Sequence, residues 1–130
     1  MRSLAREIVL QTIFSRLFNQ NDEGLFDVLS KDLKKEDKEF AAKLYTLIME
    51  NEKDFDEKLG ELSTNFKAER IHNIDRCAIF IGIAELKYFP ETPTAVIIDE
   101  AVNLSSKYST ENSADFVNGI LAVYAASVRG

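Results

Sequence analysis

The sequence predicts an all-α protein in which six or seven helices pack as antiparallel pairs. Two prolines and five glycines in 130 residues leave long stretches without helix breakers. Apolar residues recur at spacings of three and four, and no run alternates as a half-buried strand does. Apolar residues make up 45% of the chain, enough for a packed core, so we expect a single domain over residues 1–130.

The first predicted helix covers residues 3–22 and begins with Ser3, a residue type favoured at N-caps. Its apolar residues lie nearly all round the helix, so most of it should be buried. At 100° per residue, Arg2, Arg6 and Arg16 fall within an arc of roughly 80°. Residues 1–20 are also the only positively charged part of an otherwise acidic chain, whose net charge is −6.

The rest of the chain continues the helical pattern. Predicted helical segments cover 24–33, 34–63, 65–89, 94–108 and 114–128, and the charge-rich part of the second is interpreted as a solvated face. The segment over 65–89 is the most apolar, and Pro90 ends it. Cys77 lies beside its apolar stripe and is interpreted as a small core residue.

Asn118 and Gly119 interrupt an apolar run near the C-terminus. Asn-Gly is a hairpin signal, but Phe116, Ile120 and Tyr124 follow the spacing of a helix, so we predict a helix here. A glycine inside a helix costs about 1 kcal/mol relative to alanine. Two interpretations stay open: a close helix crossing with Asn118 tying down a loop, or direct contact of these residues with a ligand.

The residues that carry chemistry favour a binding protein over an enzyme. One cysteine excludes an internal disulfide, and a single histidine, His72, leaves no metal-ligand set. The chain has no glycine-rich phosphate loop and no nucleophile elbow, and its acidic pairs, such as Asp99 and Glu100, lack a histidine partner. No apolar stretch reads as a signal peptide or a membrane span, so we expect a cytoplasmic protein.

Several short motifs, in order along nearly the whole chain, resemble the NusB family of transcription antitermination factors. The most specific is Phe-Val-Asn-Gly-Ile-Leu over residues 116–121. The others are Ala-Arg-Glu at 5–7, Ile-Asp-Arg at 74–76, Glu-Leu at 85–86, Pro-Thr-Ala at 93–95 and Asp-Glu-Ala-Val at 99–102.

The resemblance implies an all-α fold of seven helices in two packed sub-bundles. It also implies a cytoplasmic adapter without catalysis, cofactor or metal. Such a protein pairs with NusE, a small-subunit ribosomal protein, and binds single-stranded boxA RNA of ribosomal RNA transcripts. The pair helps to assemble an antitermination complex on RNA polymerase.

The resemblance also implies particular site residues. Arg2 and Arg6 match the basic N-terminus that meets RNA phosphates, Phe14 matches a ring near the RNA, and residues at the start of the last helix match a segment that lies against the bases. Glu69 and Asp75 match acidic positions of the family that face the basic partner protein. The expected RNA-binding residues are Arg2, Arg6, Phe14, Asn112, Ser113, Phe116 and Asn118.

Each assignment has a purely structural alternative. Phe14 and Phe116 are also compatible with core packing, and Arg2 with a solvated terminus. Glu69 and Asp75 are equally placed to pair with neighbouring arginines. Lys107 could contact phosphate or favour the C-terminal end of its helix dipole.

Two departures from the family pattern affect RNA binding. Fewer basic residues precede Ala-Arg-Glu than in many relatives, so we predict weak RNA binding without the partner protein. Asn112 stands where relatives often carry an acid, and a neutral amide there removes a repulsion from phosphate.

Two rival functions remain. One is the NusB-like domain of an RNA cytosine methyltransferase, and the other is a protein-only adapter that has lost RNA binding. The sequence does not decide between a monomer and a homodimer.

Overall fold

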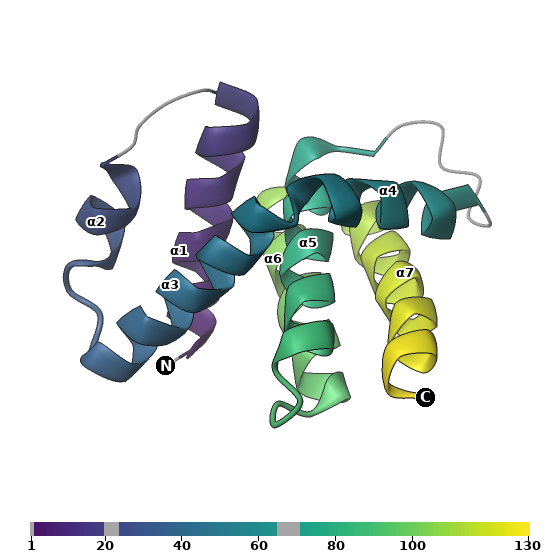
Figure 1. Ribbon diagram of the computed structural model, residues 1–130. Helices are drawn as coiled ribbons and strands as arrows, with labels where there is room; N and C mark the ends of the chain where they lie inside the picture. The colour runs from purple at the N-terminus through teal and green to yellow at the C-terminus, as the bar shows by residue number, and fades with distance from the viewer. Residues whose placement is uncertain (1, 20–23, 65–70) are drawn as a thin grey trace.

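The computed structural model describes residues 2–19, 24–64 and 71–130, which form seven α-helices and no strand (Figure 1). This confirms the all-α prediction. A short π-helix, η1, continues the first α-helix directly. In chain order the elements are α1 (Arg2–Phe14), η1 (Ser15–Asn19), α2 (Leu25–Ser30), α3 (Lys35–Glu50), α4 (Glu52–Ser63), α5 (Asn73–Tyr88), α6 (Thr94–Tyr108) and α7 (Glu111–Arg129).

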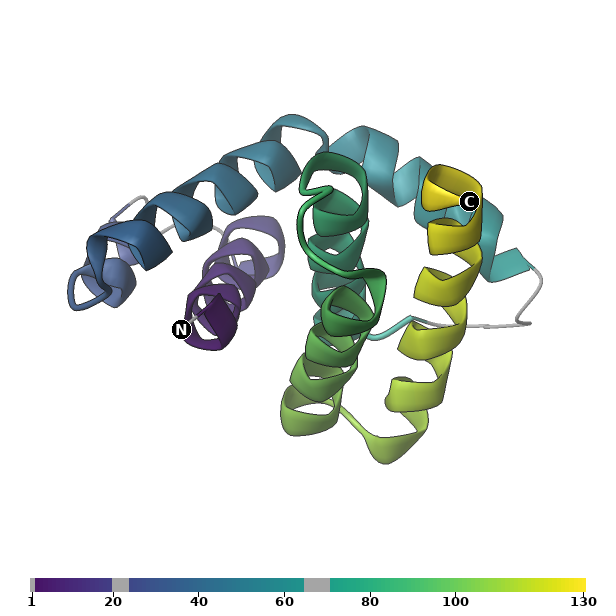
Figure 2. The same ribbon diagram turned by 90° about the horizontal axis from the view of Figure 1, so that it is seen from below.

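The helices form two groups, as expected. Seen from below, α1, α2 and α3 lie together on one side, while α5, α6 and α7 pack on one another and α4 runs across them (Figure 2). Helix α1 packs against both α3 and α5 and so joins the two groups. This arrangement places the C-terminal half of α6 beside α1 and the start of α7 beside the start of α5.

Helix α5 is the centre of the molecule because it carries the most apolar sequence. Every residue from Cys77 to Leu86 is buried. Gly82 faces Leu121 of α7 so closely that a Cβ at Gly82 would lie 2.5 Å from Leu121 Cδ1. A close helix crossing, one of the two interpretations considered for Gly119, is therefore found at Gly82 of the neighbouring helix α5.

The predicted long segment over 34–63 is two helices, because Asn51 breaks it. The backbone of Asn51 leaves the helical region (φ −116°, ψ 15°), while its N–H still donates to the carbonyls of Leu47 and Ile48. Its side-chain amide donates to the same Leu47 carbonyl at 2.8 Å. Asparagine competes for backbone hydrogen bonds in this way, which ends α3 and lets α4 begin in a new direction.

Several other helix starts differ from the predicted ones. Helix α1 already begins at Arg2, so Ser3 lies within it, donates its hydroxyl to Glu100 of α6 and is not the N-cap residue. Helix α7 begins at Glu111, three residues before the predicted start, because Thr110 is extended (φ −116°, ψ 162°) and serves as the N-cap residue. Helix α5 begins at Asn73 after an extended His72, whereas the pattern predicted a start at residue 65. Residues 65–70 lie outside the described part of the chain.

Both ends of the chain meet at the loop between α5 and α6. Arg2 Nη1 donates to Thr92 Oγ1 at 3.2 Å, and Arg129 Nη1 donates to the Thr92 carbonyl at 2.7 Å. Arg129 also donates to the carbonyls of Leu86, in the last turn of α5, and of Phe89, which follows α5 and also accepts from the Thr92 N–H. The start of α7 therefore lies at the opposite end of α5 from both termini.

None of the described helices is both long and apolar enough to cross a membrane.

Candidate nucleic-acid interface

A groove of about 330 Å³ opens between the N-terminal ends of α5 and α7. It contains four of the residues that the sequence assigned to binding. Its lining residues are Ile71, His72, Asp75, Thr110, Asn112, Ser113 and Phe116.

The floor of the groove is a buried hydrogen-bond cluster around Asp75. This carboxylate is 2% exposed and accepts hydrogen bonds from Ser113 on α7, at 2.6 Å, and from Ser105 on α6. Hydrogen bonds to an ionised group contribute roughly 1.5–3 kcal/mol each. Asp75 therefore joins three helices, and Ser113 turns its hydroxyl inward to the same cluster.

This placement does not support the predicted role of Asp75 in binding a partner protein. Its oxygens face other helices of the same chain, and its side chain is withdrawn from solvent. The expected pairing of Asp75 with a neighbouring arginine is also absent from the described contacts, since Arg76 pairs with Asp56 of α4. The other predicted partner-binding residue, Glu69, lies outside the described residues.

The wall of the groove is accessible. Asn112 is exposed and Phe116 is half-buried, one helical turn apart on the same face of α7. His72, just before α5, and Thr110, just before α7, are also exposed. Sequence reasoning missed these two residues because His72 was considered only as a metal ligand and no motif singled out Thr110.

The electrostatics of the groove suit an unpaired base better than a phosphate. The first turns of α5 and α7 present the positive ends of two helix dipoles, but Asp75 already occupies the first turn of α5. None of the seven lining residues is a lysine or an arginine. The groove thus offers an aromatic ring with neutral amide and hydroxyl groups, which stack on bases and bond to their edges.

Asn118 lies on a different face of α7. It is exposed, but at 100° per residue it points about 160° away from Phe116 and about 120° away from Asn112. The structure therefore does not bring Asn118 into the groove.

A second polar cluster lies where α1 meets the end of α6. We name it the α1–α6 seam, formed by Glu7, Gln11, Lys107 and Tyr108. Lys107 Nζ lies 2.8 Å from Glu7 Oε1, Tyr108 donates its hydroxyl to the same oxygen, and Gln11 Nε2 donates to Tyr108 at 3.3 Å. The hydrogen bond from Lys107, followed by that from Tyr108, lowers the pKa of the Glu7 carboxyl.

Phe14 extends the seam along α1. At 100° per residue it lies about 60° round the helix from Gln11, one turn further on. Its ring is half-buried and packs against Phe18 at a centroid distance of 5.7 Å. Tyr108 of the seam is followed along the chain by Thr110 and Asn112, which line the groove.

Arg2 lies away from both the groove and the seam. Its guanidinium sits 4.3 Å above the ring of Phe40 and bonds to Thr92. Thr92 and the groove flank opposite ends of α5, whose 16 residues span about 24 Å. Arg2 and Phe116 are therefore not neighbours, although the resemblance assigned both of them to RNA binding.

Arg6 is buried and fully engaged within the protein. It is 3% exposed and forms ion pairs with Glu85 on α5 and Glu100 on α6. This placement does not support a contact between Arg6 and RNA phosphates, because its guanidinium is already bonded on three nitrogens. The predicted arc is thus divided, because Arg6 is buried between α5 and α6 whereas Arg2 lies over Phe40 and Thr92.

No group of three or more potential metal ligands occurs among the residues that the structure describes.

Comparisons with known proteins place the chain in a family. The NusB family model matches residues 3–126. A transcription antitermination protein NusB from Methylacidiphilum infernorum is 34% identical over 124 residues, covering 92% of this chain and 87% of that relative.

Solved structures share the fold. T. maritima NusB superimposes with a TM-score of 0.86 at 29% identity, covering 97% of this chain and 91% of that chain. A crystal structure of the antitermination factors NusB and NusE in complex with dsRNA gives a TM-score of 0.82, covering 97% and 96%. Its identity of 23% makes it a likeness of fold alone. From the family match and the sequence identity together, the chain belongs to the NusB family.

Proposed function

We propose that this protein is a cytoplasmic transcription antitermination factor that binds single-stranded boxA RNA together with NusE. The observation that carries the proposal is the groove between α5 and α7, where Phe116 and Asn112 stand accessible beside neutral polar groups. Membership of a family whose curated relatives are named antitermination proteins supports it.

The RNA would follow a path from the seam to the groove. This path would include Phe14, the seam residues Gln11, Lys107 and Tyr108, and Phe116 in the groove. Aromatic stacking contributes roughly 1–3 kcal/mol per base, and bases in a duplex are not free to stack in this way. The proposal is therefore for unpaired RNA.

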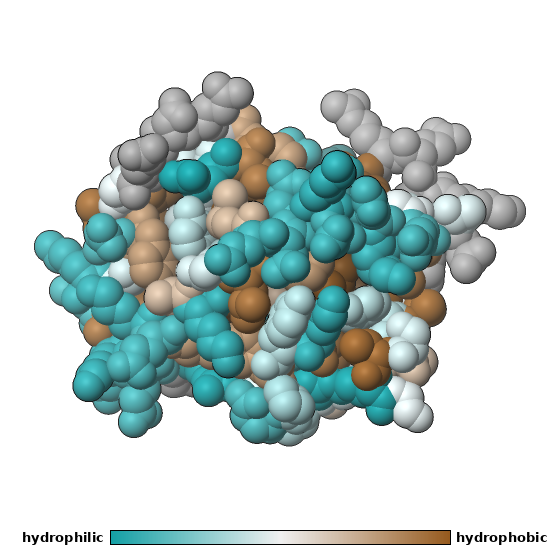
Figure 3. Space-filling view, viewed as in Figure 1, coloured by the Kyte–Doolittle hydropathy of each residue, from teal (hydrophilic) through white to brown (hydrophobic). Residues whose placement is uncertain are grey.

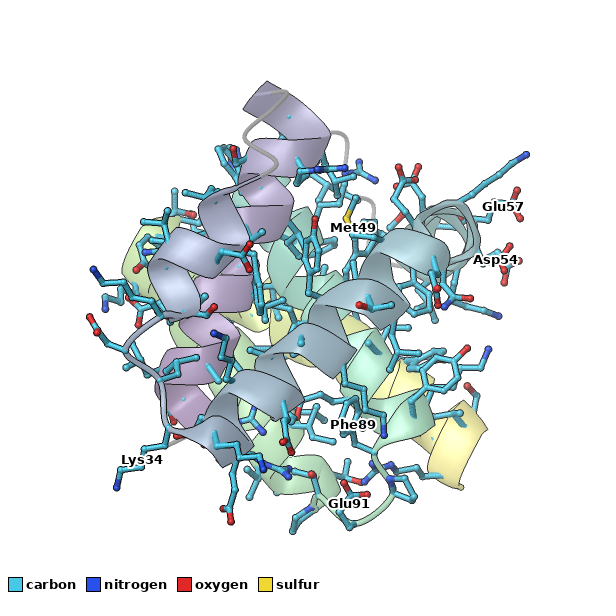
Figure 4. All side chains as sticks on the ribbon, turned by 60° about the vertical axis from the view of Figure 1, so that its left-hand side comes forward. Lys34, Met49, Asp54, Glu57, Phe89 and Glu91 are labelled. Carbon is cyan, nitrogen blue, oxygen red and sulfur yellow. The ribbon has the colours of Figure 1, made fainter. Side chains whose placement is uncertain are left out.

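NusE would meet an acidic surface. Helix α4 carries five acidic and two basic side chains, and hydrophilic residues gather over it (Figure 3). Asp54 and Glu57 project outward from α4 (Figure 4). A basic ribosomal protein would be steered towards this surface and held in register there. The pair would then join the antitermination complex on RNA polymerase, with this chain acting as an adapter.

The test is fluorescence anisotropy of labelled boxA RNA titrated with the protein, with and without NusE, across a salt series. We expect weak binding alone and tighter binding with NusE, and preference for boxA over a scrambled strand and over a boxA duplex. Phe116→Ala should weaken binding about five- to 100-fold, as expected for the loss of one stacked base.

The matched control is Phe26→Ala. Phe26 is another half-buried ring, but it stacks on Tyr45 between α2 and α3, away from the groove. Its loss should leave RNA affinity within about twofold. No RNA-dependent signal with or without NusE would overturn the proposal and favour a protein-only adapter.

A further inference from the structure

Lys107 is an exposed cation on the proposed RNA path, yet it is already paired. Its side chain is 60% exposed, in the last turn of α6. Its ammonium lies 2.8 Å from Glu7 Oε1, on a carboxylate that is 23% exposed and belongs to α1. Lys107 and Glu7 are 100 residues apart in sequence, so the contact is created by the packing of α1 on α6.

Glu7 is held in place for this contact. Tyr108 donates its hydroxyl to the same carboxylate oxygen, and Gln11 in turn donates to Tyr108. These contacts favour the ionised carboxylate, in line with the lowered pKa of Glu7 and the raised pKa of Lys107. Glu7 therefore presents a fixed negative charge to a lysine that would otherwise be free to meet phosphate.

We propose that Glu7 acts as an internal substitute for an RNA phosphate, which occupies Lys107 and limits the affinity of the isolated protein for RNA. This inference rests on the proposed function, because it concerns the same RNA-binding surface. A phosphate approaching the seam meets a neutral Glu7–Lys107 pair in place of a free positive charge.

The pair is suited to be displaced. Ion pairs between exposed side chains contribute little to stability, so exchange of the carboxylate for a phosphate is inexpensive. If Glu7 moves away from Lys107, or if another cation binds Glu7, Lys107 becomes available for one phosphate contact.

The experiment measures RNA affinity against salt concentration for the wild type, Glu7→Gln, Lys107→Gln and the double variant, by anisotropy on single-stranded boxA RNA without NusE. Each phosphate neutralised on a single strand adds about 0.7 to the slope of log affinity against log salt. We expect Glu7→Gln to steepen this slope by about 0.7. We expect its affinity at low salt to rise about three- to tenfold, as for one added ionic contact.

The double variant separates the pair from a general effect of charge. If Glu7 acts through Lys107, Glu7→Gln should steepen the slope only when Lys107 is present. Asp99→Asn, an exposed α6 carboxylate away from these contacts, controls for loss of one negative charge and should leave the slope unchanged.

The outcomes distinguish this inference from the proposed function. The Glu7 inference is overturned if the wild type binds RNA but Glu7→Gln does not steepen the salt slope. It is also overturned if Glu7→Gln steepens the slope equally in the wild-type and in the Lys107→Gln background. In both cases the proposed function stands. If neither the wild type nor Glu7→Gln binds RNA, with or without NusE, both the Glu7 inference and the proposed function are overturned.

Discussion

Arg6 and Glu85 face each other across the interior as an ion pair joined by two hydrogen bonds. Arg6 Nε lies 2.6 Å from Glu85 Oε2 and Nη2 lies 2.7 Å from Oε1, with both side chains withdrawn from solvent. Burial opposes the charge of Arg6, but the bonds and charges of Glu85 and Glu100 outweigh it and raise the pKa of the guanidinium. The pair ties α1 to the central helix.

Arg6→Ala should therefore destabilise the fold. Removing one partner of a buried ion pair leaves the other charged group buried without compensation, at a cost of about 3–5 kcal/mol. We expect a lower midpoint of urea denaturation, measured by circular dichroism, at pH 7. The double variant Arg6→Met with Glu85→Leu should recover much of the loss, because it removes the fully buried charge of Glu85 together with that of Arg6, and Glu100 is 21% exposed and keeps its hydrogen bond from Ser3. An unchanged midpoint for Arg6→Ala together with weaker RNA binding would contradict the structural role.

Two glycines in helices should respond to alanine with opposite signs. At Gly82 a Cβ would lie 2.5 and 2.7 Å from the two δ-carbons of Leu121, which is fully buried and has little room to move. Gly82→Ala should cost about 1–3 kcal/mol, as overpacked cores do. Gly60, on an exposed turn of α4, has nothing within 4 Å of its Cβ position, so Gly60→Ala should stabilise by roughly 0.5–1 kcal/mol. Thermal unfolding of the two variants checks both signs, and equal signs would contradict this packing.

The helices could be predicted from the sequence, but their interruptions only in part. Periodic apolar residues located the core helices because the residues that face a core recur at the spacing of a helix. The break at Asn51 was not predicted, because an asparagine inside a charged run that is compatible with a helix gives no distinct signal. Only the structure shows that its side-chain amide donates to the Leu47 carbonyl.

The sequence identified several residues of the groove, but it did not reveal which charged residues are buried. Asn112, Ser113 and Phe116 are brought to one groove, as their proximity in sequence implied. Arg6 and Asp75 were read as surface charges, because a charged residue is normally exposed. Their partners Glu85 and Ser105 lie 79 and 30 residues away, and no local pattern reveals such pairing.

Cys77 should be unreactive in the folded protein. Burial raises the pKa of its thiol from 9.0 to about 12, against a smaller opposing effect of the Arg76 charge. Because the thiolate is the nucleophile, we expect no reaction with Ellman's reagent at pH 8 until urea unfolds the chain. Labelling faster than global unfolding would contradict this.

The same thiol makes stability depend on alkaline pH. The unfolded chain loses the Cys77 proton above about pH 9, whereas the native state keeps it to about pH 12. The native state thus binds more protons in this range, so the free energy of unfolding falls as pH rises, by up to about 1.4 kcal/mol per pH unit. Urea denaturation from pH 8 to 10.5 should show a steeper fall for the wild type than for Cys77→Ala. Parallel pH profiles would exclude the thiol as the cause.

Charge reversal on α4 should weaken the proposed complex with NusE. Asp54→Lys with Glu57→Lys adds positive charge to the surface proposed for a basic partner, and we expect mainly slower association, by about tenfold at low salt. The matched control is Glu36→Lys with Glu39→Lys, an equal change on exposed positions of α3. Surface plasmon resonance measures both, and equal slowing by the two pairs would show that net charge, not α4, is responsible.

The same substitution, asparagine to aspartate, at Asn112 and at Asn118 should show which side of α7 faces the RNA, because both residues are exposed. Asn112 lines the groove, whereas Asn118 points about 120° away around the helix. Asn112→Asp places a negative charge beside the RNA, so we expect weaker boxA binding, by about three- to tenfold at low salt, and a smaller loss at high salt because repulsion is screened. Asn118→Asp adds the same charge to the protein on another face and should change affinity by less than about twofold. Anisotropy at fixed salt compares the two variants. Equal weakening by both would mean that RNA reaches around α7, and unchanged affinity for Asn112→Asp would remove the groove from the RNA path.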